Sequence, residues 1–158
     1  MPSRKTAIVT GASSGIGKAI SLRLLSLNYK VIGISRNIQS TDFKHEDFSA
    51  LQADLSDEVS TLKICEELKR TSVHILVNCA GFGRFEPHEE LSHKTIAQMV
   101  FLNLTTPMLL SNTLLRSLKS NDGYLINITS IEALRAVKFA GVYSATKAGL
   151  KAFGDSLF

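Results

Sequence analysis

A glycine-rich turn directly after the first predicted strand constrains the fold of the whole chain. Residues 6–9 form a short run rich in β-branched side chains, and residues 10–17 read TGASSGIG before an amphipathic stretch begins. Glycine allows the backbone to turn tightly and to approach a ligand closely. The unpaired N–H groups at the start of the following helix favour a phosphate group. The turn therefore predicts a β-α unit that binds a pyrophosphate, with a tight turn that holds no ligand as the alternative.

The rest of the chain repeats this change from a short strand to a longer helix. Such an order is typical of β-α-β units, and we expect an α/β protein with a doubly wound parallel sheet. The expected strands cover residues 6–9, 29–34, 50–53, 74–77 and 124–128. The expected helices cover residues 16–26, 56–68, a long stretch from 92, and 142 to the end. Ser56 is expected to cap the second helix, Pro107 to kink or divide the long one, and residues 38–48 remain undecided.

The composition is typical of one water-soluble domain. With 158 residues and no repeat, low-complexity tract or linker, the chain is expected to form a single domain over residues 1–158. Its net charge of +4 comes from scattered basic residues, which gives no support for nucleic-acid binding. Cys65 and Cys79 lack the spacing of metal ligands, so no metal site is expected. There is neither a signal segment nor a membrane-spanning run, and we expect a cytoplasmic protein.

The tip of the second strand indicates which dinucleotide the turn would hold. Residues 35–37 read SRN, and no acidic residue follows before Asp42. An NAD site usually has an Asp or Glu here for the ribose hydroxyls, whereas an arginine suits the 2′-phosphate of NADP. The guanidinium of Arg36 matches a phosphate, and Ser13 or Ser35 could add a hydroxyl. The sequence favours NADP over NAD, with Arg36 as a solvated surface residue as the alternative.

Tyr143 and Lys147 form a second motif, within the sequence YSATK. Residues four apart lie on the same face of a helix, one turn from each other. A neighbouring ammonium favours the phenolate and draws the pKa of a tyrosine down from about 10 towards neutrality. Ser130, thirteen residues upstream, could hold the oxygen on which charge changes. The pattern outlines a proton-transfer site; the alternative is that Ser130 caps a loop and Lys147 is a solvated lysine.

Together these motifs resemble those of the short-chain dehydrogenase/reductase family, in its non-extended form. Residues 10–17 match the TGxxxGxG turn of the family, and Tyr143 and Lys147 match its YxxxK motif. Residues 78–81 resemble its NNAG strand end, with Cys79 in place of the second asparagine. The GxxGxxG turn of extended epimerases and dehydratases does not fit, so we disfavour that alternative. The resemblance runs from residue 6 to the end of the chain and implies a Rossmann-type fold.

The resemblance also assigns roles to single residues. It implies that Tyr143 is the general acid or base, that Lys147 assists it, that Ser130 orients the substrate oxygen and that Asn103 holds a proton-relay water. The intervals of 27 residues (103 to 130) and 13 residues (130 to 143) agree with the family pattern. The residues expected to bind the cofactor are Gly11, Ser13, Ser14, Gly15, Ile16, Gly17, Arg36, Asp54, Leu55, Asn78, Ala80, Gly81, Tyr143 and Lys147.

Family members continue beyond the YxxxK helix, whereas this chain ends eleven residues after Lys147. We therefore expect five strands, with the C-terminal strands of the family missing and the edge of the fifth strand exposed. One hypothesis is an NADP-dependent oxidoreductase that interconverts a carbonyl compound with an apolar body and a secondary alcohol. The alternative is a truncated nucleotide-binding or interaction module with little turnover. The apolar stripe Ala148, Leu150, Phe153 and Leu157 fits a homodimer or homotetramer, or equally the core.

Overall fold

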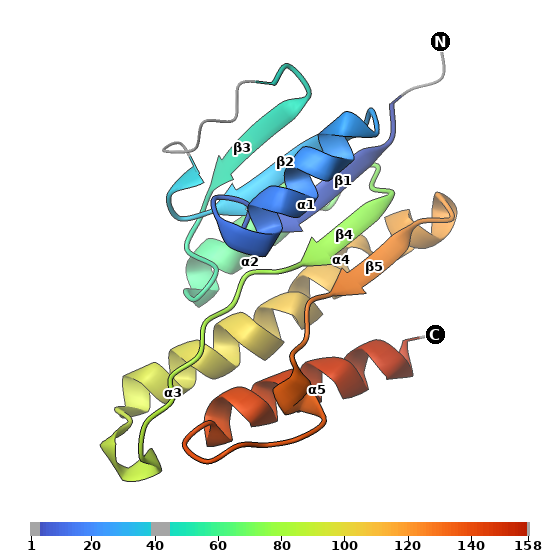
Figure 1. Cartoon of the computed structure of the whole chain (residues 1–158). Coiled ribbons are helices and arrows are strands. Elements are labelled where there is room, and N and C mark those ends of the chain that lie inside the picture. The colour runs from blue at the N-terminus through green and yellow to red at the C-terminus, as the bar shows by residue number, and fades with distance from the viewer. Residues whose placement is uncertain (1–3, 39–44, 158) are drawn as a thin grey trace.

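Five parallel strands form one sheet in the computed structural model, which describes residues 4–38 and 45–157. The strands lie in the order β3-β2-β1-β4-β5, as Figure 1 shows. The order in which the chain adds strands reverses between β1 and β4: β2 and β3 lie on one side of β1, whereas β4 and β5 lie on the other. Such a reversal leaves a crevice at the carboxyl ends of these two strands. The strands are β1 (Thr6–Thr10), β2 (Lys30–Ser35), β3 (Phe48–Gln52), β4 (Ile75–Asn78) and β5 (Tyr124–Asn127). The predicted α/β fold with a doubly wound parallel sheet is confirmed.

Helices cover both faces of the sheet (Figure 1). One face carries α1 (Gly15–Ser26), which contacts β1 and β2. The other face carries α2 (Glu58–Leu68) and α4 (Thr106–Ser120), which contact each other. Helices on both faces bury a parallel sheet on both sides, as the continuous apolar runs of its central strands require.

A second group of helices lies beyond the carboxyl ends of β4 and β5. α3 (His93–Val100) continues into α4 through η3 (Phe101–Thr105), which is one turn of π-helix. α5 (Gly141–Ser156) contacts both α3 and η3. Two short 3₁₀ turns, η2 (His88–Glu90) and η4 (Ile131–Ala133), lie in the loops that precede α3 and α5.

The alternation of side chains along β1 divides the core into two layers. Ala7 and Val9 point towards α1 and pack with Leu24 and Leu25 of that helix. Ile8 points to the opposite face and packs in the layer that α2 and α4 close. The period of two in a strand places these neighbours on opposite faces, and all three are fully buried.

One expectation about a helix end needs correction. The N-cap of α2 is Asp57 rather than Ser56, since the Asp57 carboxylate accepts from the Ser60 N–H at 2.8 Å. Ser56 donates its hydroxyl to Asp54 instead, at 2.7 Å. Both serine and aspartate are good N-cap residues. Because the Ser56 hydroxyl is engaged by Asp54, Asp57 caps the helix.

The long helix begins as predicted but is divided elsewhere. Ser92 caps α3, and its hydroxyl accepts from the Thr95 N–H at 3.0 Å. The division lies in η3 at residues 101–105, before Pro107, which is the second residue of α4. The helix is continuous at this point, since the Thr106 N–H donates to the Phe101 carbonyl in η3, and Pro107 has no N–H to continue this pattern. Of the undecided segment 38–48, residues 39–44 lie outside the described residues.

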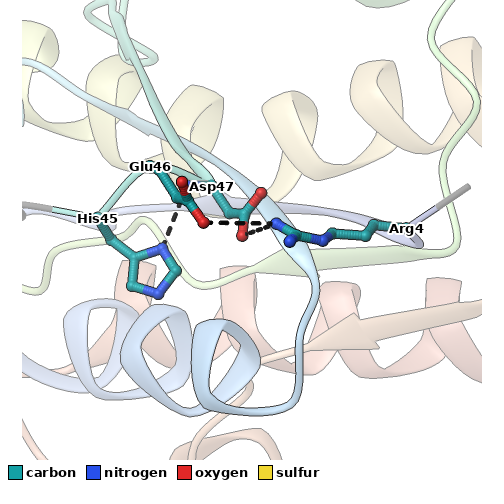
Figure 2. Close-up of polar contacts among 4 residues, drawn as sticks. All are labelled: Arg4, His45, Glu46 and Asp47. Atoms are coloured by element: carbon teal, nitrogen blue, oxygen red, sulfur yellow. Dashed lines mark hydrogen bonds and ion pairs between the residues drawn. The ribbon is translucent and has the colours of Figure 1, made fainter.

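Arg4, just before β1, is paired with the segment that leads into β3 (Figure 2). Its guanidinium contacts the Asp47 carboxylate and lies 3.9 Å from Glu46 Oε1. The Asp47 N–H donates to Nδ1 of His45 at 3.2 Å. These contacts lie at the amino ends of the strands, away from the crevice. Exposed ion pairs contribute only about 0–1 kcal/mol, so the pairing orients this end more than it stabilises the sheet.

In the described residues, β5 pairs with β4 alone and forms an edge of the sheet. Tyr124 is 67% exposed and Ile126 is 40% exposed. Their partners in the register, Ile75 and Val77, belong to the core layer on the α1 side. The α1-facing side of the edge strand is therefore apolar and open. No helix within the described ranges is long and apolar enough to cross a membrane.

We expect Leu110→Ala in α4 to lower the free energy of unfolding by about 2–5 kcal/mol, because a fully buried leucine leaves a cavity behind. Urea-induced unfolding followed by circular dichroism measures the loss. Leu22→Ala in α1 is the matched control, since that side chain is 51% exposed. Equal losses in the two variants would contradict the assignment of the core.

Candidate active site

A cavity of about 500 Å³ lies at the carboxyl ends of the central strands. Its walls come from the glycine turn after β1, the ends of the other strands and α5. Open α/β sheets bind their ligands at this edge. The lining residues are Gly11, Ser13, Ser14, Gly15, Ile16, Gly17, Ile34, Ser35, Arg36, Ala53, Asp54, Leu55, Cys79, Ala80, Gly81, Phe82, Gly83, Leu102, Ile128, Thr129, Tyr143 and Lys147.

The cavity brings together nearly all residues that were expected to bind a cofactor. Asn78 is the exception, because it is buried behind the wall and its amide donates to Asn127 Oδ1 at 2.9 Å. Tyr143 and Lys147 line the cavity, whereas the other two predicted catalytic residues lie beside it. Several lining residues carry no recognisable motif, and only the fold reveals them, among them Phe82, Leu102 and Ile128.

The glycine turn depends on the absence of side chains. Gly11 has a φ of +69° and Gly15 a φ of +52°, which are strained for other residues. A Cβ on Gly17 would lie only 2.3 Å from the carbonyl oxygen of Gly11. The Gly11 N–H donates to the Ile34 carbonyl at 2.8 Å and so fixes the turn to the end of β2. Bare backbone at the start of α1 thus faces the cavity.

Polar side chains gather where β2 and β3 end. The hydroxyls of Ser13 and Ser35 share a hydrogen bond of 2.6 Å. Arg36 lies in the same wall, and its charge acts on Asp54. Burial raises the pKa of Asp54, but hydrogen bonds from the Ser56 hydroxyl and N–H and the charge of Arg36 outweigh this effect and lower the pKa below its ordinary value. This corner can therefore offer a cation and hydroxyls to one ligand group and a carboxylate to another.

Thr10 joins the glycine turn to the loop after β4. Its buried hydroxyl oxygen accepts from the N–H groups of Cys79 and Ala80, each at 2.9 Å. The same hydroxyl is 3.4 Å from the Val77 carbonyl, to which it donates. Sequence reasoning missed this role, because nothing but the position of Thr10 at the start of the turn distinguishes it. The contact fixes two walls of the cavity relative to each other.

Asn103 occupies the π-helical turn η3 and is fully buried. Its amide donates to the Phe82 carbonyl at 2.8 Å and to Thr146 Oγ1 at 3.1 Å. Its side-chain oxygen accepts from the Phe82 N–H at 3.0 Å. Asn103 therefore connects the loop after β4 to α5, which carries Tyr143. The role of holding a proton-relay water stays a prediction.

Lys147 and Tyr143 both project from α5 at the cavity wall. The Lys147 ammonium is 5.8 Å from the centroid of the Tyr143 ring and donates to the Ile128 carbonyl at 2.8 Å. Only 5% of Lys147 is exposed, and this burial lowers its pKa from the ordinary value. The Tyr143 ring is also 5.6 Å from the ring of Phe85, centroid to centroid. A phenol and a buried ammonium thus share one end of the cavity.

Ser130 follows β5 and is the N-cap of η4. Its hydroxyl donates to the Glu132 carboxylate, and the Glu132 N–H lies 3.4 Å from the same oxygen. In the described part of the chain, the hydrogen-bond partners of the Ser130 hydroxyl are therefore on Glu132 rather than on Tyr143. Sequence reasoning did not anticipate Glu132.

Comparison with known proteins gives concordant results. The family model of the short chain dehydrogenases matches residues 5–158. Carbonyl reductase family member 4 of Danio rerio is 32% identical over 97% of this chain and 68% of its own length. The acetoacetyl-CoA reductase of an Acinetobacter strain is 31% identical over 99% of this chain and 68% of its own length.

Solved structures agree. A crystal structure of a putative NAD(P) dependent gluconate 5-dehydrogenase from Beutenbergia cavernae, with bound NADP, has a TM-score of 0.89 and 28% identity. The match covers 97% of this chain and 65% of that one. Other solved neighbours include complexes with NADP and with NADH. This chain spans about two thirds of the length of the relatives compared.

We expect Thr10→Val to lower the free energy of unfolding by about 1–3 kcal/mol, because valine leaves the N–H groups of Cys79 and Ala80 without an acceptor. Urea-induced unfolding measures the change. Thr113→Val is the matched control, because the Thr113 hydroxyl donates only within its own helix, to the Leu109 carbonyl at 2.9 Å. If both variants lost the same stability, Thr10 would not be the link between the two walls.

Proposed function

The chain belongs to the short-chain dehydrogenase family, and we propose that it interconverts a carbonyl compound and a secondary alcohol with NADP. One observation carries the proposal. Tyr143 and the buried Lys147 line the same cavity as the glycine turn, so the proposed proton donor and the proposed dinucleotide site would share one space. The sequences TGASSGIG at residues 10–17 and YSATK at residues 143–147 are the motifs that the family resemblance links to cofactor binding and to proton transfer.

The residues at the glycine turn fit a dinucleotide. A Cβ on Gly11 or Gly17 would press on neighbouring backbone, whereas a Cβ on Gly15, which lines the cavity, would meet nothing within 4 Å. The N–H groups at the start of α1 favour the negative charge of a pyrophosphate. Asp54 offers a carboxylate beside this turn, which suits the adenosine part. When bound, the nicotinamide cofactor would donate or accept the hydride.

We favour NADP over NAD because of the tip of β2. Arg36 provides a planar cation there, and the linked hydroxyls of Ser13 and Ser35 lie in the same wall. A 2′-phosphate would pair with this group, whereas no carboxylate follows β2 at residues 35–37 to hold free ribose hydroxyls. The NADP bound to the Beutenbergia cavernae relative supports this choice for the fold. Another relative is complexed with NADH, so the fold by itself does not select the cofactor. The preference for NADP in this chain therefore rests on Arg36.

Tyr143 is the proposed general acid in reduction and the base in oxidation. Its hydroxyl would give the proton to the carbonyl oxygen as negative charge develops on that atom. The Lys147 ammonium, held by the Ile128 carbonyl, would stabilise the phenolate that remains. Ser130 would donate a hydrogen bond to the substrate oxygen. Asn103 would hold the loop after β4 and the helix α5 in a fixed relative position, which would position Tyr143.

The proposed substrate has an apolar body. Phe85 lies against Tyr143, which lines the cavity, and Phe85 and Phe139 are 58% and 47% exposed. The Glu86 N–H donates to the Phe139 carbonyl at 3.1 Å and so joins the two loops that carry these rings. A homo-oligomeric state and a cytoplasmic location stay predictions. Leu150 of the apolar stripe is buried within the chain, so core packing accounts for that residue.

We expect Tyr143→Phe to lower kcat for ketone reduction by about 10²–10⁴-fold, because the proton donor is lost. The measurement is NADPH oxidation at 340 nm on a panel of aryl and alkyl ketones. Tyr124→Phe is the matched control, since Tyr124 is 67% exposed on β5. Normal turnover by Tyr143→Phe would exclude the proposed mechanism. NADPH binding without turnover by the unmodified chain would favour a nucleotide-binding module instead.

We expect Arg36→Ala to weaken NADPH binding by about 10–100-fold, because a charge-assisted hydrogen bond to phosphate is lost. NADH binding should change little. Isothermal titration calorimetry with both cofactors gives the two affinities. Arg70→Ala, at an exposed position after α2, serves as the control for a lost positive charge. Tighter binding of NADH than of NADPH by the unmodified chain would refute the role of Arg36.

A further inference from the structure

The hydrogen bond between Ser130 and Glu132 occupies the group that the proposed reaction needs. The Ser130 hydroxyl donates to Glu132 Oε2, within the 3₁₀ turn that Ser130 itself caps. Both residues are half-buried, and η4 packs against α5, which carries Tyr143. Neither residue belongs to the set that lines the cavity in the described part of the chain. The serine hydroxyl is thus directed to Glu132 and not into the cavity.

A serine hydroxyl has a single hydrogen to donate. To polarise a carbonyl, Ser130 must give that hydrogen to the substrate oxygen. In the present arrangement the hydrogen is already given to a carboxylate, which is a stronger acceptor than a neutral carbonyl. The bond to Glu132 must therefore break, or be shared, before Ser130 can act on a carbonyl substrate.

We propose that Glu132 is a positioning residue that competes with the substrate oxygen for the Ser130 hydroxyl and thereby restrains carbonyl reduction. This inference rests on the proposed function, because it concerns the same serine. Glu132 is thus a brake on reduction that acts through Ser130.

The electrostatics of the turn agree with the contact. The hydrogen bond from the Ser130 hydroxyl, and then the Glu132 N–H, lower the pKa of the Glu132 carboxyl from its ordinary value. Glu132 therefore stays ionised at neutral pH, where it is a competitor with a full negative charge.

The kinetic test is a graded series at Glu132. Glu132→Gln keeps an acceptor without the charge, and Glu132→Ala removes the acceptor. With the best ketone of the panel and NADPH, we expect kcat/KM for the ketone to rise by roughly threefold in the first and roughly tenfold in the second. The KM for NADPH should not change, because Ser130 and Glu132 lie outside the cavity lining. Glu89→Gln, at an exposed position in η2, is the matched control.

A double-mutant cycle with Ser130→Ala separates this role from a structural one. If Glu132 acts through Ser130, the Glu132 substitutions should have no effect in the Ser130→Ala background. A decrease in kcat/KM on removing Glu132, or an increase that persists without Ser130, would overturn the proposal. Unchanged kinetics in the single variants would overturn it as well.

A readout that needs no turnover tests the contact directly. Carbon-13 NMR of the Glu132 carboxyl gives its titration midpoint in the intact chain and in Ser130→Ala. We expect the midpoint to rise in Ser130→Ala, since the main cause of the lowered pKa is removed. An unchanged midpoint would overturn the inference whatever the kinetics. Failure of every ketone to react, with the midpoint shift present, would instead count against the proposed function.

Discussion

The site depends above all on the hydroxyl of Thr10, which links two segments that are distant in the sequence. One oxygen atom accepts from two consecutive N–H groups of the loop after β4, at Cys79 and Ala80. On its other side, Thr10 leads directly into the glycine turn. The glycine turn and the loop after β4, which form two walls of the cavity, are thereby fixed to each other. Asn103 continues this connection, because it holds Phe82, two residues after Ala80 in the same loop, and reaches α5 through Thr146.

The fold and most of the cavity could be predicted because they follow from periodicity and from glycine. Strands of period two and amphipathic helices define the layers, and Gly11 and Gly17 occur where no Cβ fits. Capping was harder to predict. Ser56 and Asp57 are both good caps, and only the hydrogen bond from Ser56 to Asp54 shows which of them is free to cap α2.

Other features had no local pattern to reveal them. The π-helical turn at residues 101–105 contains ordinary helix formers, and it forms where Asn103 meets the loop after β4. Glu132 was not anticipated, since a glutamate two residues after a serine carries no meaning until the 3₁₀ turn brings the two side chains together. The Asn103 contact joins segments that are far apart in the sequence, and the Glu132 contact depends on the path of the chain after β5, so no short motif marks either of them.

The open edge of β5 has a consequence for how the protein behaves in concentrated solution. In the part of the chain that the structure describes, one side of β5 pairs with no other strand, and such an edge presents a row of free backbone donors and acceptors. Tyr124 and Ile126 add an apolar surface beside it. Two copies could satisfy these groups by joining their edges into a continuous ten-stranded sheet, since each contributes five strands. Colloidal behaviour of the isolated chain, such as its solubility limit and its tendency to form fibrils, would then be governed by this strand and not by the chemistry of the cavity.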